Sequence, residues 1–292
     1  MSKFPLSYTI KSLLLLMLSL MGACTSAGQL DKSSAEGATG RYGSDSFTLV
    51  ATSPANLGLT FKSQYSAKAG QHCESHVENP GDKIKKQHQK TDKIDEKTTE
   101  QTAKFNIPLT YYIAGCTMEL ARIDISIDGR YGVSSLDIGG DIGGISVTAD
   151  SPTGEVTASS TDDPEFRGLC KWMFQLSSAR IEKDGISKIL SCSAANKNWN
   201  VPSGYLDRDK PDGTIQRSNL ENKNVKLTFR LSKDEEPSMD NRWIKTTKGW
   251  KPCQGTATSN RCQTPPIFKK FKMNDRECIV YPNCIEMGAI ND

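Results

Sequence analysis

The chain has 292 residues, a formal net charge of +3 at pH 7, and a hydrophobic fraction of 36%. Nucleic-acid-binding proteins need clustered, uncompensated Lys and Arg, so this balanced charge leads us to expect no nucleic acid partner. The length is enough for one large domain or two small ones.

Residues 1–23 have the pattern of a cleaved export signal. Two lysines precede the short apolar segment 12–21, and small residues follow at positions 22 and 23. About ten apolar residues are too few to cross a bilayer as a helix. We therefore expect the signal to be removed.

Cys24 follows this signal directly, in an order that resembles the lipobox of bacterial lipoproteins, although Met21 stands where that class prefers Leu. The resemblance implies that Cys24 is acylated and that the N-terminal lipid anchors the chain to a membrane. Thr25 follows in place of Asp, which in enteric lipoproteins implies the outer membrane. We expect a bacterial cell-envelope protein, facing the periplasm. The alternative is an ordinary secretory signal that is cut near a cysteine.

The remaining eight cysteines form an even set, which in an exported chain implies up to four disulfides. Because closing a long loop costs more entropy, near neighbours are favoured as partners. The predicted pairs are Cys73–Cys116, Cys170–Cys192, Cys253–Cys262 and Cys278–Cys284. In the last two pairs, Cys253 or Cys262 could equally reach Cys278 or Cys284.

Apolar alternation predicts strands through most of the chain. They fall at 47–52, 57–65, 107–113, 118–127, 136–149, 170–176, 179–181, 187–192 and 225–231, with edge strands at 243–250 and 279–281. The alternation changes phase near Ala121-Arg122, which predicts a bulge. No amphipathic helix of twelve or more residues follows the signal. The predicted fold is mainly β, with one or two antiparallel sandwich-like modules stapled by disulfides and a charged loop or helical insert.

Composition suggests where domains begin and end. Residues 24–45 lack apolar periodicity and are predicted to be a lipidated N-terminus with a flexible tether. A β domain is expected at 46–150, a Ser/Thr/Asp-rich linker at 151–164, and a second, disulfide-rich β module at 165–292.

The segment 72–104 is predicted to be the charged insert. Between residues 82 and 104 it has seven Lys and five acidic residues, with almost nothing apolar. A solvated hairpin loop or a polar helix is the favoured interpretation. The alternative is a partner-binding arm, whose candidate residues are Lys83, Lys85, Lys86 and Lys90.

Catalytic motifs are sparse. The three histidines, His72, His76 and His88, lie in one short stretch, and no Gly-x-Ser-x-Gly elbow accompanies them. His72 and His76 are spaced like metal ligands on a helix, but structural or solvated roles are favoured. Glycosidase carboxylates stay open, because any two acids can converge in space. The sequence therefore predicts no catalytic residue and no cofactor.

Three further groups are candidates for binding. Asp207, Asp209 and Asp212 weakly resemble a calcium loop, but Pro211 occupies a ligand position, so a polar turn is favoured. Trp243 and Trp250 are candidates for contacting a partner. The basic-aromatic segment 269–272 is either a phospholipid-facing patch or, as favoured, an exposed strand end.

These features together favour a lipid-anchored binding protein without catalysis of its own, with a protein partner. The plan of signal, anchor and β fold resembles the lipoprotein immunity proteins that neutralise toxins, for example phospholipase effectors of type VI secretion. No motif of such a family is matched. The alternative is a structural or assembly lipoprotein of an outer-membrane or secretion complex, and an envelope hydrolase is favoured least.

Overall fold

The computed structural model describes residues 40–71, 73–76, 83–85, 87–113, 115–149, 163–176, 185–202 and 208–285, without the side chains of 74–76, 83–85 and 240. Nearly all regular structure in these residues is β, which confirms the predicted fold class. The helical segments within these ranges are two 3-10 turns, η2 (Arg217–Asn219) and η3 (Asp240–Arg242). No helix in the described part is long and apolar enough to cross a membrane.

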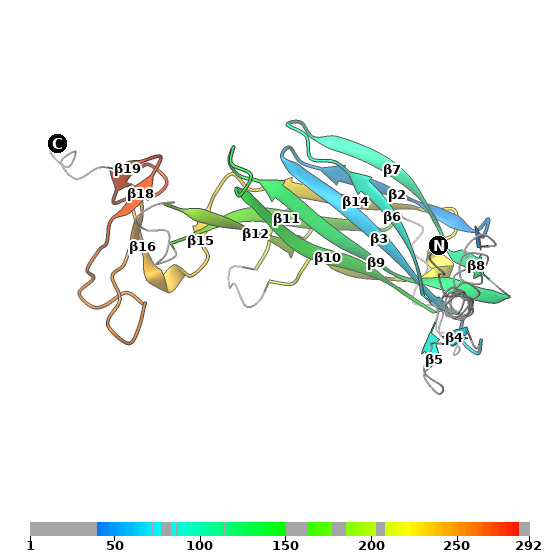
Figure 1. Cartoon of the computed structure of the whole chain (residues 1–292). Helices are drawn as coiled ribbons and strands as arrows, with labels where there is room; N and C mark the ends of the chain where they lie inside the picture. The colour runs from blue at the N-terminus through cyan, green and yellow to red at the C-terminus, as the bar shows by residue number, and fades with distance from the viewer. Residues whose placement is uncertain are drawn as a thin grey trace, which may run out of the picture. The chain divides into compact units, whose positions relative to one another are not determined.

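The strands follow one another closely along the chain (Figure 1). They are β1 (Arg41–Tyr42), β2 (Ser46–Ser53), β3 (Leu57–Ala67), β4 (Glu74–His76), β5 (Lys83–Lys85), β6 (Gln87–Ile94), β7 (Gln101–Pro108), β8 (Thr110–Ile113), β9 (Cys116–Arg130), β10 (Ile138–Thr148), β11 (Glu165–Gln175), β12 (Ser187–Ala194), β13 (Asp212–Gln216), β14 (Asn224–Leu231), β15 (Glu236–Pro237), β16 (Trp243–Thr246), β17 (Gly249–Pro252), β18 (Phe271–Met273) and β19 (Arg276–Cys278).

Two sheets contain most of these strands. One has the order β12-β11-β14-β2-β7, with β15 beside β11. The other has the order β1-β8-β9-β10-β13, and its strand β3 pairs with both β9 and β6. Most pairs are antiparallel, but β14 is parallel to β2 and to β11, β15 is parallel to β11, and β10 is parallel to β13.

The chain also divides into two compact units. The described residues of Met1–Ser44, Tyr65–His88 and Thr110–Glu119 form the smaller unit. Those of Asp45–Gln64, Gln89–Leu109 and Leu120–Asp292 form the larger unit.

The core of the larger unit is built from alternating side chains of facing sheets. In β2, Phe47 and Leu49 are buried while the residues between them are partly exposed. The rings of Phe61 in β3 and Phe105 in β7 come from different sheets and lie with centroids 5.6 Å apart. Burying each large apolar side chain contributes about 1.5–3 kcal/mol, so this face-to-face packing is the main source of the unit's stability.

The change of phase expected in β9 is confirmed. Buried positions alternate up to Leu120, two partly exposed residues follow, and burial resumes at Ile123. A strand shifts its buried set to the other face when one residue is added, so β9 keeps apolar residues on the buried side throughout.

The charged insert differs from the expected solvated loop or polar helix, because much of it is strand. β6 pairs with β3, and β7 pairs with β2. Along β6 the half-buried Lys90 is ion-paired with Asp92, and Lys93 lies 2.6 Å from Asp95, the first residue after the strand. Residues at i and i+2 share a face of a strand, so these opposite charges compensate one another within a polar strand.

The predicted boundary at 151–164 does not divide the sheets. β2 precedes it and β14 follows it, yet they pair in parallel from Thr48↔Asn224 to Thr52↔Thr228. Parallel pairing joins strands that are distant in sequence. The alternation of apolar and polar residues within a strand does not indicate which distant strand it pairs with. Of the linker itself, residues 151–162 lie outside the described residues, as does the expected strand 179–181.

All four predicted disulfides are present: Cys73–Cys116, Cys170–Cys192, Cys253–Cys262 and Cys278–Cys284. The first lies in the smaller unit and the others in the larger. Cys170 and Cys192 are directly opposite each other in β11 and β12.

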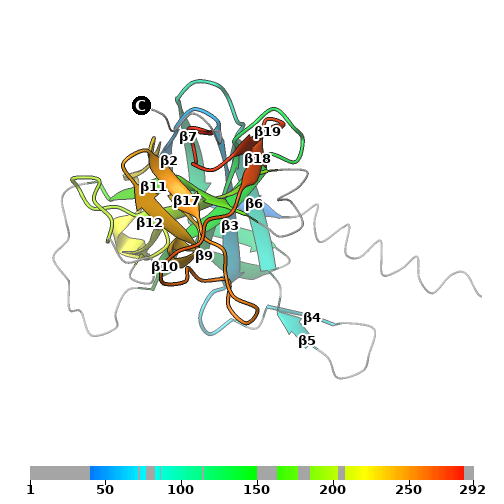
Figure 2. The ribbon, with the colours of Figure 1, turned by 90° about the vertical axis from the view of Figure 1, so that its left-hand side faces the viewer.

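Beyond β14, the chain forms two hairpins, β16–β17 and β18–β19 (Figure 2). They contribute to a buried cluster that contains Phe174, Trp243, Phe271 and Tyr281. The expected strand 279–281 is reduced to an isolated bridge between Tyr281 and Trp250. The expected strand 243–250 is the hairpin β16–β17.

Candidate functional site

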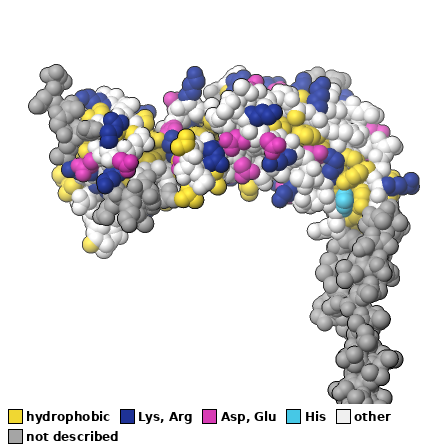
Figure 3. All heavy atoms as spheres, turned by 45° about the horizontal axis from the view of Figure 1, so that its top comes forward, with side chains coloured by type: hydrophobic (Ala, Val, Ile, Leu, Met, Phe, Trp, Pro, Cys, Tyr) yellow, Lys and Arg dark blue, Asp and Glu magenta, His cyan; other side chains and the backbone are white. Residues whose placement is uncertain are grey.

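An aromatic cluster of four residues, Tyr42, Tyr65, His88 and Tyr111, organises the smaller unit. Strand pairing places Tyr42 opposite Tyr111. The ring of Tyr111 stacks on His88 with centroids 3.6 Å apart and planes 6° from parallel. Tyr65, which is 1% exposed, lies beneath, with its centroid 5.6 Å from that of His88. Figure 3 shows hydrophobic side chains gathered beside the histidine on the surface.

Two contacts hold His88 in place. Its Nε2 lies 2.8 Å from the hydroxyl of Tyr42, and its face is covered by Tyr111. Burial lowers the pKa of His88, because a charged imidazolium loses hydration there. The ring is therefore neutral at pH 7 and part of the packing.

Arg41 and Tyr112 form a second pair in the smaller unit. They lie opposite each other in β1 and β8, with the guanidinium 5.5 Å from the ring centroid. Successive residues of a strand alternate faces, so this pair and the aromatic cluster are on opposite faces of β1–β8. Tyr112 is 37% exposed and Tyr42 is 40% exposed. Tyr and Arg are enriched at protein interfaces, which makes this edge a candidate binding surface.

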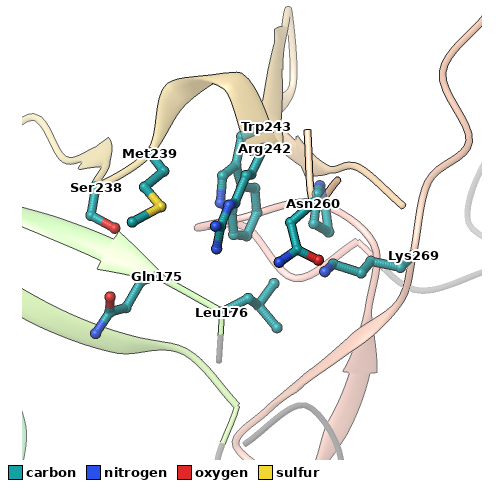
Figure 4. Close-up of a pocket in the computed structure, with 9 residues that line it drawn as sticks. Gln175, Leu176, Ser238, Met239, Arg242, Trp243, Asn260 and Lys269 are labelled. Atoms are coloured by element: carbon teal, nitrogen blue, oxygen red, sulfur yellow. The ribbon is translucent and has the colours of Figure 1, made fainter. Parts of the chain in front are cut away.

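The larger unit has a cavity beside its buried aromatic cluster, with a volume of about 60 Å³. It is lined by Gln175, Leu176, Ser238, Met239, Arg242, Trp243, Pro252, Asn260 and Lys269. A wider depression of about 470 Å³ shares four of these residues and adds Asn241, Thr258, Ser259 and Arg261. Figure 4 shows the side chains of Arg242, Asn260 and Lys269 converging on the cavity.

The lining of this cavity is basic. Arg242 and Lys269 are half-buried, Arg261 is exposed, and none of the lining residues that the structure describes is acidic. Among the described side chains, none of the three forms an ion pair. Burial lowers the pKa of Lys269, and the nearby charge of Arg242 lowers it further.

Backbone contacts fix the two half-buried cations around the end of β17. The amide of Lys269 donates to the carbonyl of Pro252 at 3.1 Å, and the amide of Cys253 donates to the carbonyl of Arg242 at 2.8 Å. The Cys253–Cys262 disulfide closes the loop that carries Asn260 and Arg261. The main chain at both basic residues is thus held by neighbouring residues of one strand end.

The predicted partner-binding residues differ in their exposure and contacts. Trp243 is 6% exposed and belongs to the buried cluster, so it is a core residue whose edge lines the cavity. Trp250 is partly buried against the same cluster. Lys90 is paired with Asp92. Lys83 and Lys85 are in β5 with undescribed side chains, and Lys86 lies outside the described residues.

The structure describes only some residues of the other predicted sites. Cys24, His72 and Asp207 lie outside the described residues. Asp212 lies 3.5 Å from Arg122, and the backbone carbonyl of Asp209 accepts from Ala194. Within the described residues, no three His, Cys, Asp or Glu side chains are grouped as a metal site.

Sequence reasoning missed Tyr42, Tyr111 and Arg242 and noted Lys269 only as one member of a basic patch. Arg242 and Lys269 come together through backbone pairing across a disulfide-closed loop, so no spacing motif marks them. Comparison of the chain with protein families, curated proteins and solved structures finds no match.

Proposed function

We propose that this chain is a binding protein of the bacterial cell envelope, anchored by lipid at Cys24, that binds a protein partner and performs no chemistry on it. In its most concrete form it is an immunity protein. It would bind a toxin that acts in the periplasm or on the membrane, such as a phospholipase effector of type VI secretion.

The observation that supports a protein partner is the set of exposed aromatic and basic side chains at the edge formed by β1 and β8. Tyr42 and Tyr112 are both well exposed there, and Arg41 lies over the ring of Tyr112. Large amphipathic rings give contact area at low entropic cost, and Arg adds hydrogen bonds. The export-type signal and four disulfides support an oxidising, extracytoplasmic location.

The first experiment is capture of the full chain from gently solubilised envelopes, followed by mass spectrometry. One stoichiometric small partner with hydrolase features supports the immunity role. Recovery of many outer-membrane or secretion components instead favours the assembly lipoprotein. A chain recovered without any partner contradicts the proposal.

The binding surface is tested with the double variant Arg41→Ala/Tyr112→Ala. Both side chains lie on one exposed face, so the variant should fold while losing at least tenfold in partner affinity, the effect of removing one interface hot spot. Ile142→Ala is the matched control, because Ile142 is a 64% exposed side chain of the larger unit. Equal affinity in the double variant and the control would exclude this edge.

Deletion of residues 82–104 is a poor test of the same idea. It removes β6 and part of β7, which pair with β3 and β2. Loss of binding would then report loss of the fold. Point substitutions on the exposed edge avoid this ambiguity.

A further inference from the structure

The basic cavity of the larger unit holds two cationic side chains that no described acidic side chain pairs with. Arg242 and Lys269 line it together with the amide side chains of Gln175 and Asn260. Among the side chains that the structure describes, none that lines the cavity or the wider depression is acidic. Bringing like charges together out of water costs free energy, so an arrangement of this kind favours an anion between them.

The neighbouring Lys270, in contrast, has its charge balanced by an acidic side chain. Its Nζ lies 2.6 Å from Glu277, and its side chain is exposed. Lys269, one residue earlier, is half-buried and faces Arg242 with no acidic partner among the described residues. The contrast places the uncompensated charge at the cavity and not along the whole basic segment.

We propose that this cavity binds a phosphate group, either inorganic phosphate or the phosphomonoester of a larger molecule. The fork of Arg242 matches phosphate oxygens, Lys269 supplies a point charge, and Asn260 offers an amide donor. A phosphomonoester carries about −1.5 to −2 at pH 7, which balances two cations better than one carboxylate does.

The size and rigidity of the cavity suit a small ion. Its volume of about 60 Å³ exceeds the roughly 10–15 Å³ that holds a single water. The disulfide Cys253–Cys262 and the backbone hydrogen bonds at β17 fix the main chain that carries the two cations before any ligand arrives. Binding therefore loses little free energy to ordering of the backbone. The wider depression, with Arg261 at its edge, leaves room for the rest of a phosphomonoester.

The probe is inorganic phosphate, titrated calorimetrically into the full chain at constant ionic strength. Lys269→Met and Arg242→Gln should each weaken binding about tenfold or more, because each removes a charged hydrogen-bond donor. Lys270→Met is the matched control and should bind like the unaltered chain. Equal weakening by all three variants, or no heat of binding in the unaltered chain, would overturn the assignment.

A second readout protects the test against misfolding. Without phosphate, Lys269→Met should melt no lower than the unaltered chain, because the substitution relieves repulsion from Arg242. Phosphate should raise the melting temperature of the unaltered chain but not of Lys269→Met, since a ligand stabilises only the state that binds it. A phosphate-dependent rise in Lys269→Met would contradict the proposal.

Two further arms identify the source of the phosphate group. Soluble glycerol phosphate is compared with vesicles that contain phosphatidic acid, with phosphatidylcholine vesicles as the reference. Binding of glycerol phosphate supports a soluble ligand, and selective binding of phosphatidic acid supports a lipid headgroup. The proposal is contradicted if the chain binds both vesicle types equally and binds neither inorganic phosphate nor glycerol phosphate. The cavity variants leave Arg41 and Tyr112 intact, so a negative result here is distinct from failure of partner binding.

Discussion

Tyr281 illustrates how a single side chain joins the C-terminal hairpins to the sheet. It is 3% exposed, and its hydroxyl donates a hydrogen bond to Glu235, which also lies 2.6 Å from Lys188 in β12. Burial raises the pKa of Tyr281, and the charge of Glu235 raises it further. The hydroxyl thus stays protonated and keeps donating across the whole neutral range.

Replacing Tyr281 by Phe removes this bond and leaves the ring in place. We expect the free energy of unfolding to fall by about 1.5–3 kcal/mol, the usual range for a hydrogen bond to a charged group. Chemical denaturation measures the change. Tyr112→Phe serves as the control because Tyr112 is exposed, and a larger loss in that variant than in Tyr281→Phe would contradict the account.

His88 gives the chain a dependence on pH. Its pKa in the folded chain is lowered by burial from the usual value of about 6.5. Below pH 6.5 the unfolded chain therefore binds a proton at His88 more readily than the folded chain does. The free energy of unfolding decreases as the pH is lowered, until the pH reaches the pKa of His88 in the folded chain.

The prediction is that acidification from pH 7.5 to 5 lowers the melting temperature more in the unaltered chain than in His88→Gln. Glutamine does not titrate in this range, so the difference between the two curves isolates His88. Superimposable pH profiles would show that His88 contributes nothing to the pH dependence.

Strand β10 contains a glycine that is needed for close packing. A Cβ at Gly139 would lie 2.8 Å from the ring of Trp172 and 3.1 Å from the backbone nitrogen of Leu190. The backbone there does not have a positive φ, so the residue type is set by space.

Gly139→Ala should therefore cost about 1–3 kcal/mol of unfolding free energy through overpacking. Ile142→Ala, on an exposed position of the same strand, should cost much less. Urea denaturation compares the two. A stable Gly139→Ala would mean that Trp172 can move aside without penalty.

The disulfides close loops of very different length. Cys73–Cys116 spans 43 residues and Cys253–Cys262 spans nine. In the chain-entropy account, the longer loop contributes about 1 kcal/mol more, because more disorder is removed from the unfolded chain. Double Cys→Ala variants of each pair, compared by denaturation midpoints, test this. A greater loss from the shorter loop would point to packing around Cys253 as the dominant effect.

Strands with uninterrupted alternation were predicted with nearly the observed bounds. β2 and β14 each repeat apolar and polar residues, and the structure gives them nearly the predicted bounds. β6 was missed because its half-buried positions include Lys90 and Asp92, which look solvated until the ion pair between them is seen. β13 was missed because it is only five residues long and follows a polar turn.

At the scale of the whole molecule, the sequence predicts the class of fold and the disulfides but not the strand order. Near-neighbour pairing succeeded for the cysteines because each of the eight is bonded to the one next to it in sequence order. The strand order could not be predicted in this way, because β10 and β13, like β2 and β14, meet across long connections. The basic cavity could not be predicted for the same reason: its cations meet through tertiary pairing.

The proposed membrane anchoring is tested at this scale as well. If the proposal holds, Cys24→Ser should release the protein from the membrane fraction into the soluble periplasmic fraction, because the thiol proposed to accept the lipid is gone. Cell fractionation with immunodetection measures this. If the variant stays with the membrane, either lipid is not the anchor or a bound partner holds the chain there.

The position of β2 in its sheet makes the order of synthesis matter. β2 lies between β7 and β14, and β14 ends at Leu231. While the chain is being made, an apolar strand near the beginning must wait for a neighbour that appears only after most of the chain. Until then its open edge can pair with other chains, as unpaired strand edges do. A nascent chain of this design is expected to depend on holding chaperones, and C-terminal truncations that reach β14 should aggregate instead of giving a shorter stable protein.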